Sequence, residues 1–191
     1  MKKVVFIGDS ICYGYGATDL FGWSQRLARK LTAEGWLTEI CAVPGERSAH
    51  IIFRLQRDVI DKHPDVCFVK LGLANEGLRS AQTPEKREAI RRTFLTNLSF
   101  IIGKLHENNI RAVLGGLSIG RDYTPEQIAL LHRAQEDMRS LGVPVVEWMD
   151  KMTDESGLGR RELLFDQGHP NDEGYRVMYD CIPENIMELA R

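Results

Sequence analysis

The sequence predicts an α/β fold: a three-layer α/β/α sandwich with a five-stranded parallel sheet between two layers of helices. Short apolar runs rich in β-branched residues alternate along the chain with longer segments whose apolar residues recur at helical spacing. Alternating strands and helices favour parallel strands joined by right-handed crossovers. A parallel sheet is buried on both faces, so its strands are almost continuously apolar, as Val4–Ile7 is.

Three of the predicted strands lie in the first half of the chain. The first covers about Lys3 to Ile7, and a loop broken by glycines follows it at Ile11–Gly16. A helix is expected from about Gly22 to Gly35, because its apolar residues share one face and a glycine ends it. The remaining elements of this half are a strand at Leu37–Val43, a helix at Ser48–Lys62 and a strand at Val66–Leu71.

The second half begins with a long helix from about Pro84 to Asn108, which Thr83 can cap. A capping box at Thr124–Gln127, with proline at the first helical position, predicts a helix that runs to about Leu141. The final helix is expected at Asp172–Ala190, where Pro183 would kink it or split it in two. The remaining segments are strands at Arg111–Leu117 and Val143–Glu147 and a polar loop at Asp150–Arg160.

We expect the strands in the flavodoxin-like order 2-1-3-4-5, with helices on both faces of the sheet. The 191 residues are enough for one hydrophobic core, and no repeat, low-complexity tract or linker divides them. The interpretation is therefore a single domain over residues 1–191.

Composition excludes some classes of partner. The net charge of −2 makes nucleic acid a poor candidate. No apolar run approaches the roughly 18 residues of a membrane span. The basic start Met1–Lys3 precedes a short apolar stretch, but Asp9 interrupts that stretch too early for a signal peptide. We therefore expect a cytoplasmic protein.

The cysteines and histidines show no metal-binding pattern. The four cysteines include no C-x-x-C pair. His50, His63, His106 and His132 share no spacing typical of metal ligands. We therefore expect no metal and no other cofactor.

Ser10 follows the first strand, where open α/β sheets carry their chemistry. A serine hydroxyl attacks only when a base takes its proton. His169 comes just before the last helix and three residues after Asp166. An imidazole needs such a carboxylate to hold its tautomer and to stabilise its charged form. We expect a catalytic triad of Ser10, Asp166 and His169.

Two further strand ends offer donors for the oxyanion that forms when an ester carbonyl is attacked. Gly45 follows the second strand, and its missing side chain lets a backbone N–H approach a ligand. Asn75 follows the third strand and carries a side-chain amide. Because strands two, one and three are neighbours in the expected order, Gly45, Asn75 and the Ser10 N–H should meet at one edge of the sheet.

Taken together, these blocks resemble the SGNH hydrolases, also called GDSL-type esterases. Gly8-Asp9-Ser10, Gly45, Asn75 and Asp166-x-x-His169 stand in the family's order and span positions 8 to 169. The resemblance implies an ester-hydrolysing serine esterase or lipase without a metal. It matches Ser10 to the nucleophile, Gly45 and Asn75 to the oxyanion hole, and Asp166 and His169 to the rest of the triad.

The sequence departs from the family pattern in two blocks. The third block usually reads Gly-x-Asn-Asp, whereas here Gly72 is one position too early, Ala74 precedes Asn75 and Glu76 follows it. The second block often has an asparagine and an extra glycine, where this chain has Ile40–Pro44. Neither change removes a proposed donor, so we expect them to affect the shape of the pocket more than the type of reaction.

Ser118 is a competing nucleophile, because Gly116–Gly120 matches the G-x-S-x-G elbow of α/β-hydrolases and follows a strand. Such an elbow leads directly into a helix, but Arg121–Tyr123 intervene before the cap at Thr124. Ser10 is therefore the favoured nucleophile.

The leading hypothesis is a serine esterase that hydrolyses a small-molecule acyl ester through an acyl-enzyme on Ser10. A thioesterase or acyltransferase on the same fold is one alternative, and a non-catalytic flavodoxin-like module that binds a small ligand is another. Acyl chain length, leaving group and oligomeric state stay open at this point.

Overall fold

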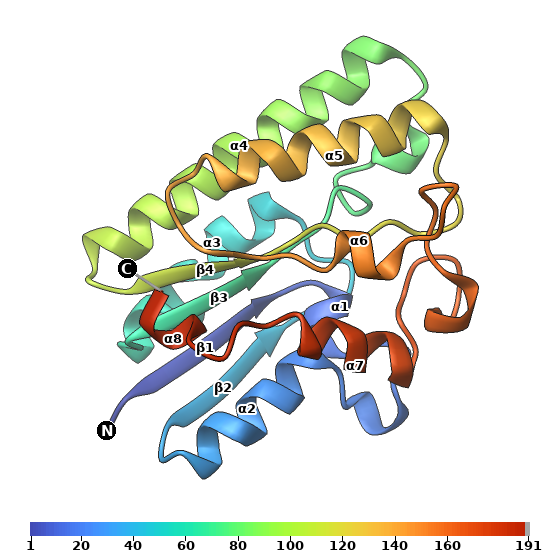
Figure 1. Cartoon of the computed structure of the whole chain (residues 1–191). Helices are drawn as coiled ribbons and strands as arrows, with labels where there is room; N and C mark the ends of the chain where they lie inside the picture. The colour runs from blue at the N-terminus through green and yellow to red at the C-terminus, as the bar shows by residue number, and fades with distance from the viewer. Residues whose placement is uncertain (190–191) are drawn as a thin grey trace.

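The computed structural model describes residues 1–189 and has a five-stranded sheet between two layers of helices (Figure 1). The strand order is β2-β1-β3-β4-β5, and every neighbouring pair is parallel. The predicted fold class and strand order are therefore confirmed. The strands are β1 (Lys3–Gly8), β2 (Leu37–Ala42), β3 (Val66–Lys70), β4 (Arg111–Gly115) and β5 (Val145–Val146).

The helices divide between the two faces of the sheet (Figure 1). One face is covered by α3 (Ser48–Asp58), α4 (Pro84–Glu107) and α5 (Pro125–Arg139). The other is covered by α1 (Ser10–Tyr13), α2 (Trp23–Ala33), α7 (Asp172–Asp180) and α8 (Ile186–Leu189). Shorter elements are the helix α6 (Met149–Met152) and the 3-10 helices η1 (Thr18–Leu20), η2 (Ile60–Lys62), η3 (Leu78–Ser80) and η4 (Arg161–Leu163).

The strand β1 shows why the apolar runs are continuous. Val5 and Ile7 belong to the core under α3, α4 and α5, whereas Val4 and Phe6 belong to the core on the opposite face. On that second face, the Phe6 ring stacks on Phe68 with centroids 5.0 Å apart. Because each face is covered, every residue of the run is withdrawn from water.

Several predicted boundaries change. Residues 10–13 form the helical turn α1 and not a loop, because Asp9 caps it. The helix expected at Asp172–Ala190 is two helices, since α7 ends at Asp180 and α8 begins after Pro183; Ala190 itself lies outside the described residues. The polar loop begins with α6, and β5 is shorter than predicted because Pro144 has no N–H for the ladder.

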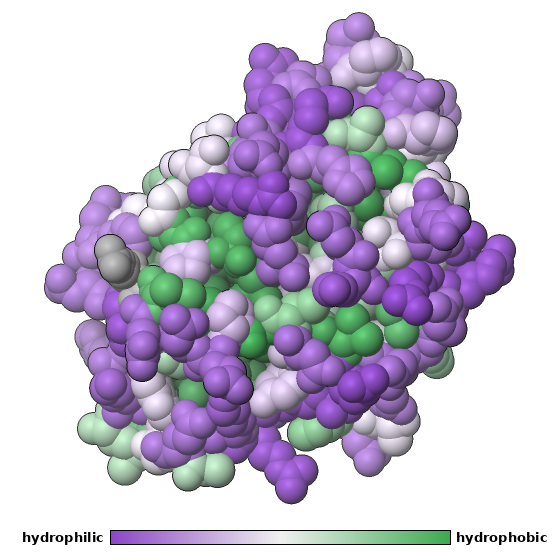
Figure 2. All heavy atoms as spheres, in the orientation of Figure 1, coloured by the Kyte–Doolittle hydropathy of each residue, from purple (hydrophilic) through white to green (hydrophobic). Residues whose placement is uncertain are grey.

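The face of the molecule seen in Figure 2 is mostly hydrophilic. Figure 2 shows apolar residues gathered in a band between the upper helices α4 and α5 and the lower helices α7 and α8. Among residues 1–189, no helix has the length and apolar character needed to cross a membrane.

The strands place three chain segments at one edge of the sheet. Gly8, at the end of β1, is paired with Ala42 of β2 on one side and with Lys70 of β3 on the other. The residues that follow these strands therefore leave the sheet side by side. They include Ser10, Gly45 and Asn75.

Candidate active site

The first and last parts of the chain meet at Ser10. Its Oγ lies 2.9 Å from His169 Nε2, although 159 residues separate the two positions. On the other side of the imidazole, Nδ1 lies 2.8 Å from Asp166 Oδ2. The three residues predicted to form a triad are thus joined in one chain of hydrogen bonds.

Ser10 is positioned by its neighbours in sequence and by β3. Asp9 Oδ1 accepts hydrogen bonds from the Ile11 N–H at 2.9 Å and the Cys12 N–H at 3.4 Å, which caps α1 just before the serine. A Cβ atom at Gly8 would lie 2.1 Å from the Lys70 carbonyl oxygen, so β1 and β3 approach this closely only with glycine there. The hydroxyl therefore stands on a backbone with little freedom.

Lys70 lies under this turn and is fully buried. Its Nζ is 3.4 Å from Asp9 Oδ2 and 3.5 Å from the Leu71 carbonyl oxygen. A buried ammonium is tolerated only when it is paired, and the Asp9 carboxylate is its partner. The sequence analysis missed Lys70, although a lysine at the end of an otherwise apolar buried strand was a signal available there.

The loop before α7 holds His169 in place. Asp166 Oδ1 accepts the N–H groups of Gly168 and His169, both at 2.8 Å, while Oδ2 faces the imidazole. Partial burial acts to raise the pKa of Asp166, but the hydrogen bonds from these two N–H groups and from the imidazole outweigh it and lower the pKa below its usual value. The carboxylate is therefore charged at neutral pH and orients the ring.

Asn75 and Gly45 occupy different positions relative to the site. Asn75 shares a small cavity of about 70 Å³ with Ser10 and His169. Its Nδ2 donates to the Glu46 carbonyl oxygen at 2.9 Å, and an amide nitrogen carries a second hydrogen. Gly45 is exposed in the turn after β2, with φ of 78°, and is not among the described residues that line the cavity. Its role as an oxyanion donor stays a prediction.

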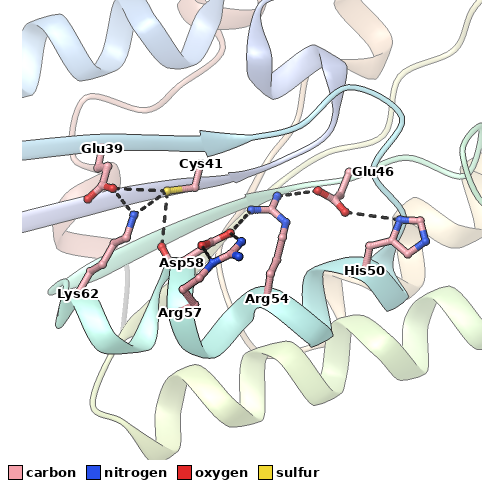
Figure 3. Close-up of polar contacts among 8 residues, drawn as sticks. All are labelled: Glu39, Cys41, Glu46, His50, Arg54, Arg57, Asp58 and Lys62. Carbon is pink, nitrogen blue, oxygen red and sulfur yellow. Dashed lines mark hydrogen bonds and ion pairs between the residues drawn. The ribbon is translucent and has the colours of Figure 1, made fainter.

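The turn after β2 is anchored by charges on α3 (Figure 3). The buried Glu46 carboxylate lies 2.8 Å from Arg54 Nη2 and 3.5 Å from His50 Nδ1. Arg54 also reaches Asp58 Oδ2 at 2.8 Å, so one guanidinium joins both carboxylates. Since the Glu46 backbone carbonyl holds Asn75, this network also fixes the asparagine.

Glu76 makes a second tie between the same two loops. Its Oε1 accepts the N–H of Ser48 at 2.6 Å, and Ser48 is the first residue of α3. No side chain of the residue before the helix caps it, so Glu76 supplies that cap from another strand end. The residue that departs from the family pattern thus has a structural partner, which the sequence analysis did not foresee.

Ser118 lines the same cavity as Ser10. Its hydroxyl oxygen is buried and has no hydrogen-bond partner within the described part of the chain. The imidazole of His169 is bonded to Ser10, and α5 begins only at Pro125, so Ser118 does not stand at the start of a helix. The geometry therefore favours Ser10 over Ser118 as the nucleophile.

Arg79 and Tyr123, which the sequence analysis also missed, complete the wall near Ser118. The Arg79 guanidinium lies 5.3 Å from the centre of the Tyr123 ring, and its Nε is 2.8 Å from Asp122 Oδ2. Burial raises the pKa of Tyr123 to about 12, so the phenol keeps its proton at neutral pH. Among residues 1–189, no three His, Cys, Asp or Glu side chains are grouped so that they could hold a metal ion.

Comparison with known proteins identifies similar chains. The model of the GDSL-like Lipase/Acylhydrolase family matches residues 6–177. The lipase/acylhydrolase from Enterococcus faecalis is similar in structure, with a TM-score of 0.74, 20% identity and coverage of 100% of this chain and 96% of that one.

Two further solved structures have the same fold. The esterase EstA from a Pseudoalteromonas species has a TM-score of 0.71 and 22% identity, with 98% of each chain covered. A GDSL-like lipase from Bacteroides thetaiotaomicron has a TM-score of 0.72 and 19% identity, with 98% of this chain and 88% of that one covered. The sequence comparison with curated proteins gave no match.

Proposed function

The chain belongs to the GDSL-like lipase/acylhydrolase family of carboxylic ester hydrolases, and we propose that it cleaves small-molecule acyl esters through an acyl-enzyme on Ser10. One observation carries this proposal. The Ser10 Oγ, the two ring nitrogens of His169 and the Asp166 carboxylate follow one another at 2.9 and 2.8 Å. These are hydrogen-bond distances, and the order is that of a nucleophile, its base and the base's partner.

The first half of the reaction forms the acyl-enzyme. Ser10 Oγ attacks the ester carbonyl carbon while His169 Nε2 takes its proton. The Asp166 carboxylate accepts a hydrogen bond from the Nδ1–H group, which leaves Nε2 unprotonated to act as the base and stabilises the imidazolium that forms. Its lowered pKa supports this role, because only the ionised carboxylate stabilises a positive ring.

Negative charge develops on the carbonyl oxygen during the attack. Ser10 is the first residue of α1, so its N–H has no partner within that helix and is available to this oxygen. The second amide hydrogen of Asn75 is the next proposed donor, and the Gly45 N–H is the third. Each donor of this kind is worth about 10²–10³-fold in rate.

The second half of the reaction releases the acid. His169 gives its proton to the leaving alcohol, and then takes a proton from a water molecule that attacks the acyl carbon. The bond between the acyl carbon and Ser10 Oγ then breaks, which releases the acid, and the imidazole returns its proton to Ser10 Oγ. The enzyme is restored, and one ester and one water molecule have become one alcohol and one acid.

The test is hydrolysis of a short-chain aryl ester by the wild type and by two serine variants. Ser10→Ala should abolish turnover to near the background rate, whereas Ser118→Ala should keep most of it. Loss with Ser118→Ala and retention with Ser10→Ala would overturn the assignment. Two parallel assays test the alternatives. An acyl-thioester substrate tests for thioester hydrolysis, and an acceptor alcohol added to the oxygen ester tests for acyl transfer from the same acyl-enzyme.

A further inference from the structure

Two exposed aromatic side chains lie in a row with the imidazole. The Tyr15 and His169 ring centroids are 4.7 Å apart, with planes 60° from each other. The Phe165 ring meets Tyr15 edge-on, with centroids 6.0 Å apart. Tyr15 is 42% exposed and Phe165 is 59% exposed, so Tyr15 offers apolar surface to solvent beside the proposed base and Phe165 extends that surface.

Hydrogen bonds join the backbone of each aromatic residue to a residue of the proposed triad. The Tyr15 N–H donates to the Ser10 carbonyl oxygen at 3.0 Å, and the Phe165 N–H donates to the His169 carbonyl oxygen at 2.9 Å. The Tyr175 hydroxyl also donates to the Tyr15 carbonyl oxygen at 2.8 Å. The two aromatic residues therefore keep a fixed position relative to the nucleophile and the base.

Gly16 lets the two segments come together. It has φ of 96°, and a Cβ atom there would lie 2.5 Å from the Pro170 carbonyl oxygen and 2.9 Å from Phe165 Cβ. A side chain at this position would push the Phe165 segment away from Tyr15. Because the backbone at both aromatic residues is fixed, a ligand that covers the rings need order only the side chains.

The reaction itself determines which part of an ester reaches these rings. His169 Nε2 must come within about 3 Å of the leaving oxygen to protonate it, so the alcohol lies against the imidazole. The small cavity that Asn75 lines is separate from these rings, because the residues in 1–189 that line it include Ser10 and His169 but neither Tyr15 nor Phe165. At about 70 Å³ this cavity is far below the 300 Å³ or more of a site for a drug-sized ligand, so it suits a short acyl group.

Building on the proposed function, we infer that Tyr15 and Phe165 form the subsite for the alcohol part of the ester. They select alcohols that carry a flat ring with an apolar face, either an aryl ring or the face of a pyranose, joined to a short acyl group. Aromatic side chains bind such faces by stacking or edge contacts.

The experiment compares kcat/KM for three acetate esters: benzyl acetate, an acetylated methyl pyranoside and ethyl acetate, whose alcohol has no ring. Phe165→Ala should lower kcat/KM for benzyl acetate by roughly three- to tenfold, the size expected from one aromatic contact. If the subsite accepts pyranose faces, kcat/KM for the acetylated methyl pyranoside should fall by a similar factor. Ethyl acetate should change less than about twofold. Tyr15→Ala combined with Phe165→Ala should widen the gap between ring and non-ring esters further.

Two controls keep the result specific. Phe100→Ala removes an aromatic side chain of similar exposure, 47%, from α4 and should alter none of the three values. Tyr15→Phe keeps the ring and should retain the selectivity. Equal losses on all three esters, or no loss with Phe165→Ala, would overturn the subsite. A wild type that hydrolyses none of the esters would instead contradict the proposed function.

Discussion

The two sides of the site are held by different kinds of contact. On the side of the proposed nucleophile, Asp9 caps the turn that contains Ser10, and Asp166 holds His169 three residues away. On the oxyanion side, the loops after β2 and β3 hold each other, through Asn75 to the Glu46 carbonyl and through Glu76 to Ser48.

This difference explains which parts of the family pattern this chain keeps. A contact within three residues depends on a fixed spacing, so Gly8-Asp9-Ser10 and Asp166-x-x-His169 are intact. A contact between two loops depends only on how closely the loops lie in the folded chain, not on a fixed spacing in the sequence. Glu76 therefore serves where the family usually has aspartate, because a longer side chain still reaches the start of α3.

The largest expected effect is on the nucleophile side. His169→Ala removes the proposed base, and kcat on a short-chain aryl ester should fall by about 10³-fold or more, since a general base and its partner act as a unit. The stability against urea should change little, because the side chain is partly exposed. Near-normal turnover at neutral pH by a folded His169→Ala variant would refute the assigned base.

Asn75→Ala tests the oxyanion side. The loss of this proposed donor should lower kcat by about 10²–10³-fold while KM changes much less, because such a donor acts on charge that appears only in the transition state. Asn75→Asp keeps the shape, removes the donor and adds a negative charge beside the developing oxyanion, so kcat should fall at least as far. A variant whose KM rises while kcat is unchanged would show that Asn75 only binds substrate.

Lys70→Met tests how much the lysine of β3 stabilises the turn that carries the proposed nucleophile. The change leaves the buried Asp9 carboxylate without its partner, which typically costs about 3–5 kcal/mol of unfolding free energy. Urea unfolding measures this loss. Combining Asp9→Asn with Lys70→Met removes both charges and should recover most of the stability, whereas additive losses would mean that the two groups do not act as a pair.

The smallest expected effect is that of Glu76→Ala. The start of α3 loses one cap, which is worth about 1 kcal/mol of stability. Asn75 keeps its bond to Glu46, so kcat should fall only a few fold. Glu76→Gln keeps an acceptor for the Ser48 N–H and should recover most of both quantities. A loss as large as that of Asn75→Ala would assign Glu76 a direct part in the chemistry.

The sequence predicted those features that periodicity or short spacing encodes. The alternation of apolar runs with helical segments predicted a parallel α/β sheet, whereas the strand order followed from its likeness to a flavodoxin-like arrangement. The polar residues after each strand indicated which edge carries the candidate site. The turn α1 was missed because four residues are too few to show a helical period. The Lys70–Asp9 pair and the tie from Glu76 to Ser48 were missed for another reason. They join residues 61 and 28 positions apart, whose approach depends on how the strands pack.

The central claim is that Ser10 is the nucleophile, activated by an imidazole from the far end of the chain. Treatment with a fluorophosphonate followed by peptide mass spectrometry tests it most directly, because the reagent bonds only to an activated serine. We predict one adduct, on the peptide that contains Ser10, and no adduct in His169→Ala. An adduct on the Ser118 peptide, or an unlabelled wild type, would contradict the claim.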